Sequence, residues 1–387
     1  MNKIVIAADS FKGCLSSKEV AESIAAGIRK VYPHCEIACI SIADGGEGFC
    51  QAVIDNKNGH TIETVVHDPL MRTIAAEYAI IDKQTAIIES AQASGLPLLR
   101  EEKRNPLITS TYGTGELIKD AIAKGCRHIV IGLGGSATND GGLGMLMALG
   151  YRFYDSNGNP ILQQGGQALG HIAHIDTTQR IPELAQCTFT IACDVDNPFI
   201  GDNGATYVYA PQKGANKDSL EELEKNMRHW CAILFQHTNI DLSTVKGSGA
   251  AGGLAGAFIA LMDAKTVSGI DYILHSVDFD KQIVNADLVI TGEGKIDRQT
   301  LMGKAPQGIL KRTHNYAIPT IALVGSITDT LSDLHSGFDG IFPIQAGPIS
   351  LREAMEHPIA RENLTRTIEQ LLLFHKGTCH SHKNIKE

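Results

Sequence analysis

The sequence of 387 residues has few aromatic residues, no apolar run long enough to span a bilayer and no Cys-x-x-Cys pair among its cysteines. Aromatic residues make up 5% of the chain while glycine occurs 39 times, which favours an α/β protein with tight strand-to-helix turns over a β-sandwich. The nine cysteines include no Cys-x-x-Cys pair. We therefore expect reduced thiols, as in a cytoplasmic protein, and no disulfide framework.

The charge balance argues against nucleic acid and anionic membranes as partners. The chain has 34 basic and 43 acidic residues and a net charge of -9, so it lacks the basic surface that such polyanions require. At the N-terminus the apolar run is interrupted by Asp9, which makes it too short for a secretion signal. These features predict a cytoplasmic protein of about two domains.

Several nucleotide-binding and hydrolase motifs are missing. The sequence contains no GxxxxGK[ST] phosphate loop, none of the protein-kinase motifs VAIK, HRD and DFG, no GxSxG and no HExxH. Residues 247–252 (GSGAAG) match the dinucleotide-binding pattern GxGxxG, but no convincing buried strand precedes them. This match is the basis for one alternative function, an NAD-dependent hydroxy-acid dehydrogenase, with Asp271 near the spacing expected of a ribose-binding acid.

Short apolar segments that run into glycine-rich loops predict a parallel sheet with helical crossovers. The four clearest examples are Lys3–Ala7 before Asp9–Gly13, Glu36–Ile42 before Asp44–Gly48, His128–Gly132 before Gly134–Gly142, and Asp287–Thr291 before Gly292–Asp297. Ser16 and Glu19 predict a capping box at the start of the first helix.

The middle of the chain has a different pattern and predicts a second, inserted domain. Thr61–Ile81 is typical of paired strands, Thr206–Ala210 of a further strand, and Asp218–Gln236 of a long helix around the only tryptophan. We assign residues 1–65, 105–142 and 285–387 to a discontinuous parallel-sheet domain. Residues 66–104 and 143–284 form the predicted inserted α/β domain.

The loops that end the predicted strands combine glycine with acids or lysine. Glycine lets the backbone approach a phosphate, and carboxylates at the same sheet edge are suitable ligands for Mg²⁺. Because phosphoryl transfer depends mainly on positioning and charge neutralisation, this combination indicates a phosphotransferase.

Eight segments in order closely resemble the bacterial glycerate kinase family. They are ADSFKGCLS, ADGGEG, GTGEL, GLGGSATNDGGLGML, ACDVDNP, APQKGA, GAAGGL and TGEGKIDRQTLMGKAP. The resemblance implies an ATP- and Mg²⁺-dependent kinase that phosphorylates D-glycerate. It also implies a flavodoxin-like or Rossmann-like domain interrupted by a domain similar to a restriction-endonuclease fold, with the active site between them.

The motifs then suggest individual roles, which are our own inference. Asp194, preferred over Asp196, is the candidate base, Lys12 neutralises charge on the transferred phosphate, and Asp297 with Glu293 holds Mg²⁺. The candidate ATP-binding residues are Gly134, Gly135, Ser136, Asn139, Asp140, Gly292, Gly294 and Lys304. The candidate glycerate-binding residues are Asp9, Ser10, Asp44, Gly45, Gly46 and Glu47.

Some questions stay open from sequence. Arg72, Arg104 and Arg298 are equal candidates for binding the glycerate carboxylate. The sequence does not distinguish 2-phosphoglycerate from 3-phosphoglycerate as product, and it indicates neither the oligomeric state nor a role for the His-rich C-terminal tail. A second alternative function is a non-catalytic sensor of sugar acids. This alternative does not explain why the four loops contain acids and lysines.

Overall fold

The computed structural model describes residues 1–296, 305–328 and 337–383, which fold into two compact units. Unit 1 comprises residues 1–44, 55–57 and 270–387, and unit 2 comprises residues 45–54 and 58–269. Each unit contains its own sheet with helices packed on it, and most strand pairs are parallel. The prediction of an α/β protein is confirmed.

Unit 1 is built on a five-stranded sheet in which every neighbouring pair is parallel. Its strands are β1 (Lys3–Ile6), β2 (Glu36–Cys39), β11 (Leu288–Ile296), β12 (Thr320–Ile327) and β13 (Gly340–Pro343). The spatial order is β2-β1-β11-β12-β13. Renumbered along the chain this is 2-1-3-4-5, the order of flavodoxin-type doubly wound sheets, whose ligands bind where the order reverses.

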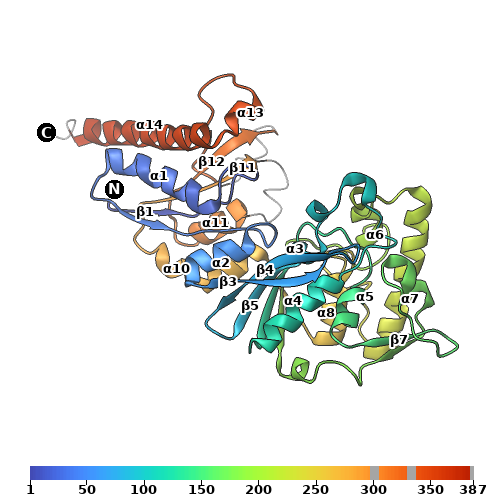
Figure 1. Cartoon of the computed structure of the whole chain (residues 1–387). Helices are drawn as coiled ribbons and strands as arrows, with labels where there is room; N and C mark the ends of the chain where they lie inside the picture. The colour runs from blue at the N-terminus through green and yellow to red at the C-terminus, as the bar shows by residue number, and fades with distance from the viewer. Residues whose placement is uncertain (297–304, 329–336, 384–387) are drawn as a thin grey trace. The chain divides into compact units, whose positions relative to one another are not determined.

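Helices cover both faces of this sheet (Figure 1). On one face α1 (Ser17–Val31) and α14 (His357–Lys383) lie side by side, so closely that a Cβ at Gly27 would be 2.4 Å from the carbonyl oxygen of Thr365. On the other face α11 (Ala305–His314) packs its Leu310 against Ala322 and Val324 of β12. The remaining helices of unit 1 are α9 (Gly269–Ser276), α10 (Phe279–Gln282) and α13 (Leu351–Ala354). The predicted capping box of Ser16 and Glu19 is confirmed.

Unit 2 contains a six-stranded mixed sheet in the order β10-β9-β6-β5-β4-β3. Its strands are β3 (His60–His67), β4 (Thr73–Ile81), β5 (Thr85–Glu89), β6 (His128–Gly132), β9 (Thr188–Ala192) and β10 (Lys265–Val267). The first two pairs along the chain, β3–β4 and β4–β5, are antiparallel, and the others are parallel. Strands β7 (Arg152–Tyr154) and β8 (His174–Asp176) form a separate antiparallel pair.

The helices of unit 2 share one hydrophobic core with this sheet. They are α3 (Ala91–Ser94), α4 (Tyr112–Ala123), α5 (Leu143–Ala148), α6 (Ala205–Tyr209), α7 (Lys217–Thr238) and α8 (Leu254–Met262). Helix α2 (Phe49–Lys57) begins in unit 2, and its last three residues belong to unit 1. Trp230 of α7 is fully buried, and its Nε1 donates to the carbonyl oxygen of Gly141 at 3.0 Å. The prediction of a strand at Thr206–Ala210 is wrong, because α6 occupies this segment.

The observed unit boundaries differ from the predicted domain boundaries. Residues 105–142, which we assigned to the first domain, lie in unit 2, because β6 pairs with β5 on one side and β9 on the other. Residues 58–65 follow β3 into the same sheet. Conversely, residues 270–284 belong to unit 1, where Arg312 of α11 forms ion pairs with Asp271 and Asp280.

The segment Gly292–Ile296 also differs from its prediction as a loop. It continues β11, and Gly292, Glu293, Lys295 and Ile296 are in register with residues of β12. A Cβ at Gly292 would lie 2.2 Å from the carbonyl oxygen of Leu323, so the glycine is needed for close strand approach.

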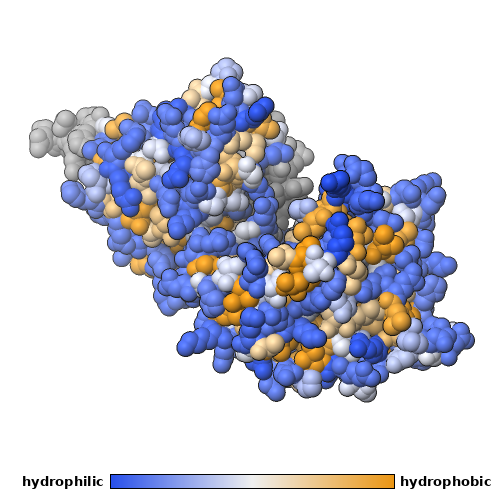
Figure 2. Space-filling view, viewed as in Figure 1, coloured by the Kyte–Doolittle hydropathy of each residue, from blue (hydrophilic) through white to orange (hydrophobic). Residues whose placement is uncertain are grey.

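On the face that Figure 2 shows, both units are largely hydrophilic, with smaller apolar patches. Within the described residues, no helix combines the length and apolar character needed to cross a bilayer.

Candidate functional site

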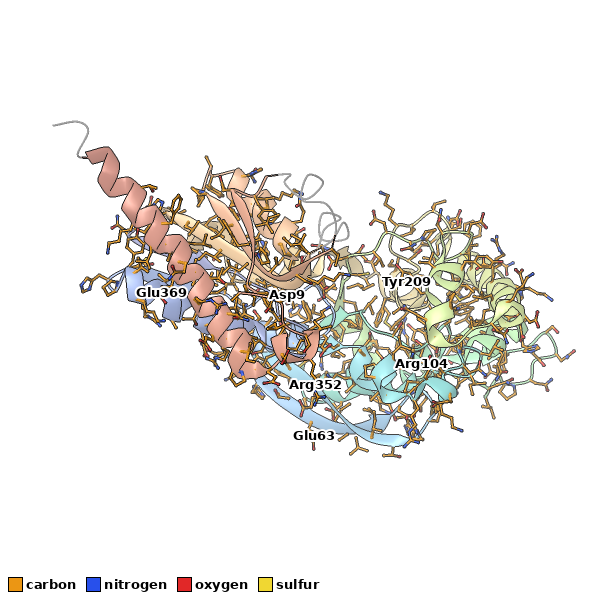
Figure 3. All side chains as sticks on the ribbon, turned by 90° about the horizontal axis from the view of Figure 1, so that it is seen from above. Asp9, Glu63, Arg104, Tyr209, Arg352 and Glu369 are labelled. Atoms are coloured by element: carbon orange, nitrogen blue, oxygen red, sulfur yellow. The ribbon has the colours of Figure 1, made fainter. Side chains whose placement is uncertain are left out.

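A cavity of about 360 Å³ opens in unit 1 beyond the carboxyl ends of β1, β11 and β12. It lies where the strand order reverses between β1 and β11, the position at which doubly wound sheets bind ligands. One end of the cavity is lined by polar side chains, those of Asp9, Ser10, Lys12, Asp44, Glu293 and Lys295. Figure 3 labels Asp9 at this end of the sheet. The structure therefore brings six predicted site residues together in the lining of this cavity, namely Asp9, Ser10, Lys12, Asp44, Glu293 and Gly294.

The loop after β1 is shaped by its own backbone hydrogen bonds. The Asp9 amide continues the ladder to β11 by donating to the carbonyl oxygen of Gly292 at 2.8 Å. Phe11 and Leu15 then pair with each other at 2.8 and 2.9 Å, and Gly13 between them has φ 72°, a conformation that glycine adopts without strain. This tight turn places Lys12 beside the acids, with its Nζ 3.6 Å from Asp44 Oδ2.

Asp9 is a buried carboxyl group in an acidic environment. Burial raises its pKa to about 7, and the neighbouring Asp44 and, more weakly, Glu293 act in the same direction. The Ser10 amide, which donates to Asp9 Oδ1 at 2.6 Å, and the charge of Lys12 act in the opposite direction. A carboxylate cluster of this kind favours a cation among its oxygens.

The glycine-rich run 134–142 lies in unit 2 and is mostly buried. The carboxylate of Asp140 is fully buried and accepts hydrogen bonds from Thr111 N and Oγ1, both at 2.8 Å, and from Gly142 N and Gly144 N at 3.2 and 3.1 Å. Asn139 is also buried and donates from Nδ2 to Thr206 Oγ1 at 3.3 Å. These contacts indicate that Asn139 and Asp140 support the loop from inside, whereas Gly135 is exposed, with φ 74°.

Lys213 is a buried residue that our site prediction missed. Its Nζ donates to Ser136 Oγ at 2.9 Å and to the carbonyl oxygen of Thr138 at 2.7 Å, so it ties the loop to the turn before α7. Burial lowers its pKa to about 7, while the charge of Asp140 acts in the opposite direction. The signal was present, because this lysine stands in the segment APQKGA that carries part of the family resemblance.

A second group of predicted residues meets at the carboxyl ends of β6 and β9 in unit 2. A Cβ at Gly134 would be 2.6 Å from the Cα of Gly46, and one at Gly45 would be 3.0 Å from the carbonyl oxygen of Ala192, so the glycines permit close backbone approach. Just after β9, Asp194 is half-buried, and its Oδ1 accepts from Gly269 N at 3.0 Å.

Two further acids near this edge of unit 2 differ in their exposure to solvent. Glu47 is exposed, whereas Glu89 at the end of β5 is buried and accepts from the amide of Cys50 at 2.8 Å. Burial raises the pKa of Glu89. Sequence reasoning missed Glu89, although an acid at the end of the apolar segment Thr85–Glu89 marks the same sheet edge.

Of the remaining predicted site residues, some lie outside the described part of the chain and others lie within it. Asp297, Lys304 and Arg298 lie outside the described residues. Arg72 is engaged in an ion pair with buried Asp68 at 2.5 Å, while Arg104 Nε is buried without a hydrogen-bond partner among the described residues. In the part of the chain that the structure describes, no group of three His, Cys, Asp or Glu side chains is arranged to hold a metal ion by itself.

The fold and the site define a two-unit α/β protein with a charged ligand site at the topological switch point of a doubly wound sheet. The model of the glycerate kinase family matches residues 4–376, and the chain belongs to that family. It is 44% identical over 382 residues to a glycerate kinase of Bacillus cereus, covering 98% of this chain and 100% of the relative. It is 42% identical over 366 residues to the glycerate 2-kinase of Escherichia coli, covering 94% and 95%.

A solved structure from Salmonella typhimurium LT2, described as a glycerate kinase 2, has a TM-score of 0.88 and 38% identity to this chain. The alignment covers 98% of this chain and 99% of that structure. The dehydrogenase alternative receives no support. Residues 247–252 form turns rather than a strand-to-helix loop, and the carboxylate of Asp271 is 3.2 Å from Arg312.

Proposed function

We propose that the chain transfers the γ-phosphate of ATP to D-glycerate, with 2-phosphoglycerate as the product. The observation that carries the proposal is the cluster of acids and lysines at the switch point of unit 1, in a chain whose family is the glycerate kinases. The choice of the 2-hydroxyl is supported by the Escherichia coli relative, which is named as a glycerate 2-kinase.

The polar end of the unit 1 cavity suits a magnesium-bound polyphosphate. Mg²⁺ binds through one or two carboxylates together with phosphate oxygens and water, so Glu293 and Asp44 are sufficient protein ligands here. When bound, the ion would neutralise charge on the phosphates. Lys12 stands beside Asp44 and would supply a further positive charge to the transferred phosphate.

The residues for glycerate are proposed from unit 2. Asp194 remains the candidate base for the glycerate hydroxyl, supported by its place after β9 and by a carboxylate that Gly269 N orients. Arg104 is the better-supported candidate for the glycerate carboxylate, because Arg72 is engaged with Asp68. The backbone of Arg104 lies against Gly214, next to Lys213 and the loop that it holds. The resemblance of this unit to a restriction-endonuclease fold also stays part of the proposal, supported by its mixed central sheet.

The activity is tested by ADP release from Mg-ATP with D-glycerate, L-glycerate or no acceptor. We expect release only with D-glycerate and complete loss when EDTA removes the metal. Phosphorus NMR of the product should show 2-phosphoglycerate. Robust turnover in EDTA, or an absence of turnover with D-glycerate, would overturn the proposal, while a 3-phosphoglycerate signal would overturn the choice of hydroxyl.

A further inference from the structure

The cavity of unit 1 is lined by two kinds of side chain. Asp9 interacts with Asp44, Glu293 and Lys12, and this polar group is here called the charged end. The apolar lining residues, here called the apolar end, are Phe11, Cys14, Ile344, Leu351, Ala354 and Met355, and the lining also includes the polar Ser326 and Gln345. Its volume of about 360 Å³ falls within the range of roughly 300–1,000 Å³ that is usual for small-molecule sites. A ligand that fills it must therefore be charged at one end and apolar at the other.

Glycerate does not meet this requirement. It is a three-carbon acid without an apolar part, so an apolar wall contributes nothing to its binding. Its carboxylate would also face Asp9, Asp44 and Glu293. A magnesium-bound nucleotide meets both requirements, because its metal and phosphates suit the charged end and its base suits the apolar end.

We propose that this cavity is the nucleotide site and that its apolar end, formed in part by α13 and Met355, binds the adenine base of ATP. The inference rests on the proposed function for the identity of the nucleotide. Of the candidate ATP-binding residues predicted from sequence, Gly294 lines this cavity, whereas Gly134, Gly135, Ser136, Asn139 and Asp140 lie in unit 2.

The apolar wall belongs to unit 1 and lies next to the loop that carries Lys12. A capping box starts α13, with Ser350 Oγ accepting from Glu353 N at 3.2 Å and Glu353 Oε2 accepting from Ser350 N at 2.9 Å. Met355 follows the helix, and its Cε would be 3.3 Å from a Cβ at Gly13. The wall and the phosphate-facing loop are thus in contact, as one ligand spanning both ends requires.

One lining residue of the cavity is a glycine. This glycine is Gly294, and a Cβ there would be 3.4 Å from Phe11 Cα, so a larger side chain would occupy space above the turn of the first loop. The glycine at position 141 of the buried run 134–142 has another explanation. A Cβ at Gly141 would be 2.5 Å from the ring of Trp230, which is a packing requirement of unit 2.

The test places a charge on the apolar wall of the full-length protein. Met355→Asp changes an exposed lining residue, while Arg352→Asp changes an exposed residue of the same segment that does not line the cavity and alters the net charge more. Arg352 is labelled on α13 in Figure 3. Isothermal titration calorimetry then measures the binding of Mg-ATP and of magnesium tripolyphosphate, which has the phosphates without the base.

We expect Met355→Asp to weaken Mg-ATP binding at least 10-fold and to change tripolyphosphate binding less than 2-fold, with Arg352→Asp and Met355→Leu close to wild type in both. Equal ATP affinity of Met355→Asp and wild type would overturn the inference. So would equal losses for ATP and tripolyphosphate. These outcomes are distinct from failure of the proposed function, in which the wild-type protein would bind Mg-ATP without phosphorylating D-glycerate or would not bind it.

Discussion

The loops that follow β1 in unit 1 and β6 in unit 2 both contain an acid and glycine, but the two acids, Asp9 and Asp140, lie in different environments. In unit 1, Asp9 faces a cavity together with Asp44 and Glu293, and this environment raises its pKa to about 7. In unit 2, Asp140 faces away from solvent and accepts hydrogen bonds from Thr111 and from the amides of Gly142 and Gly144.

The difference distinguishes two roles for a carboxylate in a glycine-rich loop, namely binding a ligand and supporting the fold. A carboxylate whose oxygens are saturated by its own fold stabilises that fold, whereas carboxylates that crowd one another around a cavity destabilise it and are retained for a ligand. This comparison supports a binding role for the loop after β1 and a supporting role for Asp140. The four substitutions below are ordered by their expected effect on activity or stability.

The largest effect is expected for Asp194→Asn in unit 2. If this residue is the base for the glycerate hydroxyl, kcat should fall by roughly 10²–10⁴, because the neutral amide cannot accept the proton. Steady-state kinetics and calorimetric ATP binding measure the two properties separately, and ATP binding should be retained. The matched control is Asp196→Asn, two residues further on, where the side chain is 82% exposed and pairs with Lys246. Similar kcat values for the two variants would remove Asp194 from catalysis.

Lys12→Met tests the charged end of unit 1. Loss of the positive charge beside Asp44 should lower kcat by about 10²–10³, since one electrostatic contact to the transferred phosphate is removed. Lys18→Met, at an exposed position of α1, is the control and should leave kcat unchanged. Wild-type kinetics for Lys12→Met would show that Lys12 does not contribute to phosphate transfer.

Asp9→Asn should stabilise the protein at pH 8 by an amount of up to about 4 kcal/mol. The pKa of Asp9 is raised from 3.8 to about 7 in the folded state, so its ionisation destabilises the folded protein. This destabilisation begins near pH 4, increases with pH and reaches its full value above pH 7. The gain in melting temperature should therefore be largest at pH 8 and disappear near pH 4. Calorimetry in EDTA measures it, because a bound divalent cation would offset the repulsion.

The control for this prediction is Asp202→Asn, at an exposed position, which should not show this pH-dependent gain. A destabilised Asp9→Asn variant at pH 8 would contradict the comparison between the units.

The smallest effect is expected for Asp140→Asn. This substitution should lower the free energy of unfolding, whereas Asp9→Asn should raise it. The amide would present a donor to neighbouring donors, and at least one buried group would lose its partner, which costs about 1–3 kcal/mol. Trp230 is the only tryptophan and donates to Gly141, so its fluorescence reports the unfolding of unit 2. Unchanged unfolding with strongly impaired ATP binding would instead support the sequence-based assignment of Asp140 to the nucleotide.

Much of the fold was predictable because it follows from local patterns. The buried strands at Lys3–Ala7 and His128–Gly132, the long helix around Trp230 and the capping box at Ser16 each depend on a few neighbouring residues, and all are present. The ordered family motifs likewise identified the family, which the whole-chain match confirms.

The errors arose where long-range pairing overrides local pattern. Gly292–Ile296 has the composition of a loop but is held in β11 by β12, and 105–142 joins unit 2 because β6 lies between β5 and β9. Thr206–Ala210 contains β-favouring residues, yet it forms helix α6, with Ala205 part of the core of unit 2.

The sequence by itself determined the α/β class, the family and the loops in which the chemistry was to be sought. Only the tertiary structure decided which charged residues of those loops line the cavity of unit 1. Asp9 and Asp140 both stand in loops that contain glycine, and the distinction between them depends on distant partners, Glu293 for one and Thr111 for the other. Burial and hydrogen bonding are properties of the packed chain, so the same residue type can bind a ligand in one unit and support the backbone in the other.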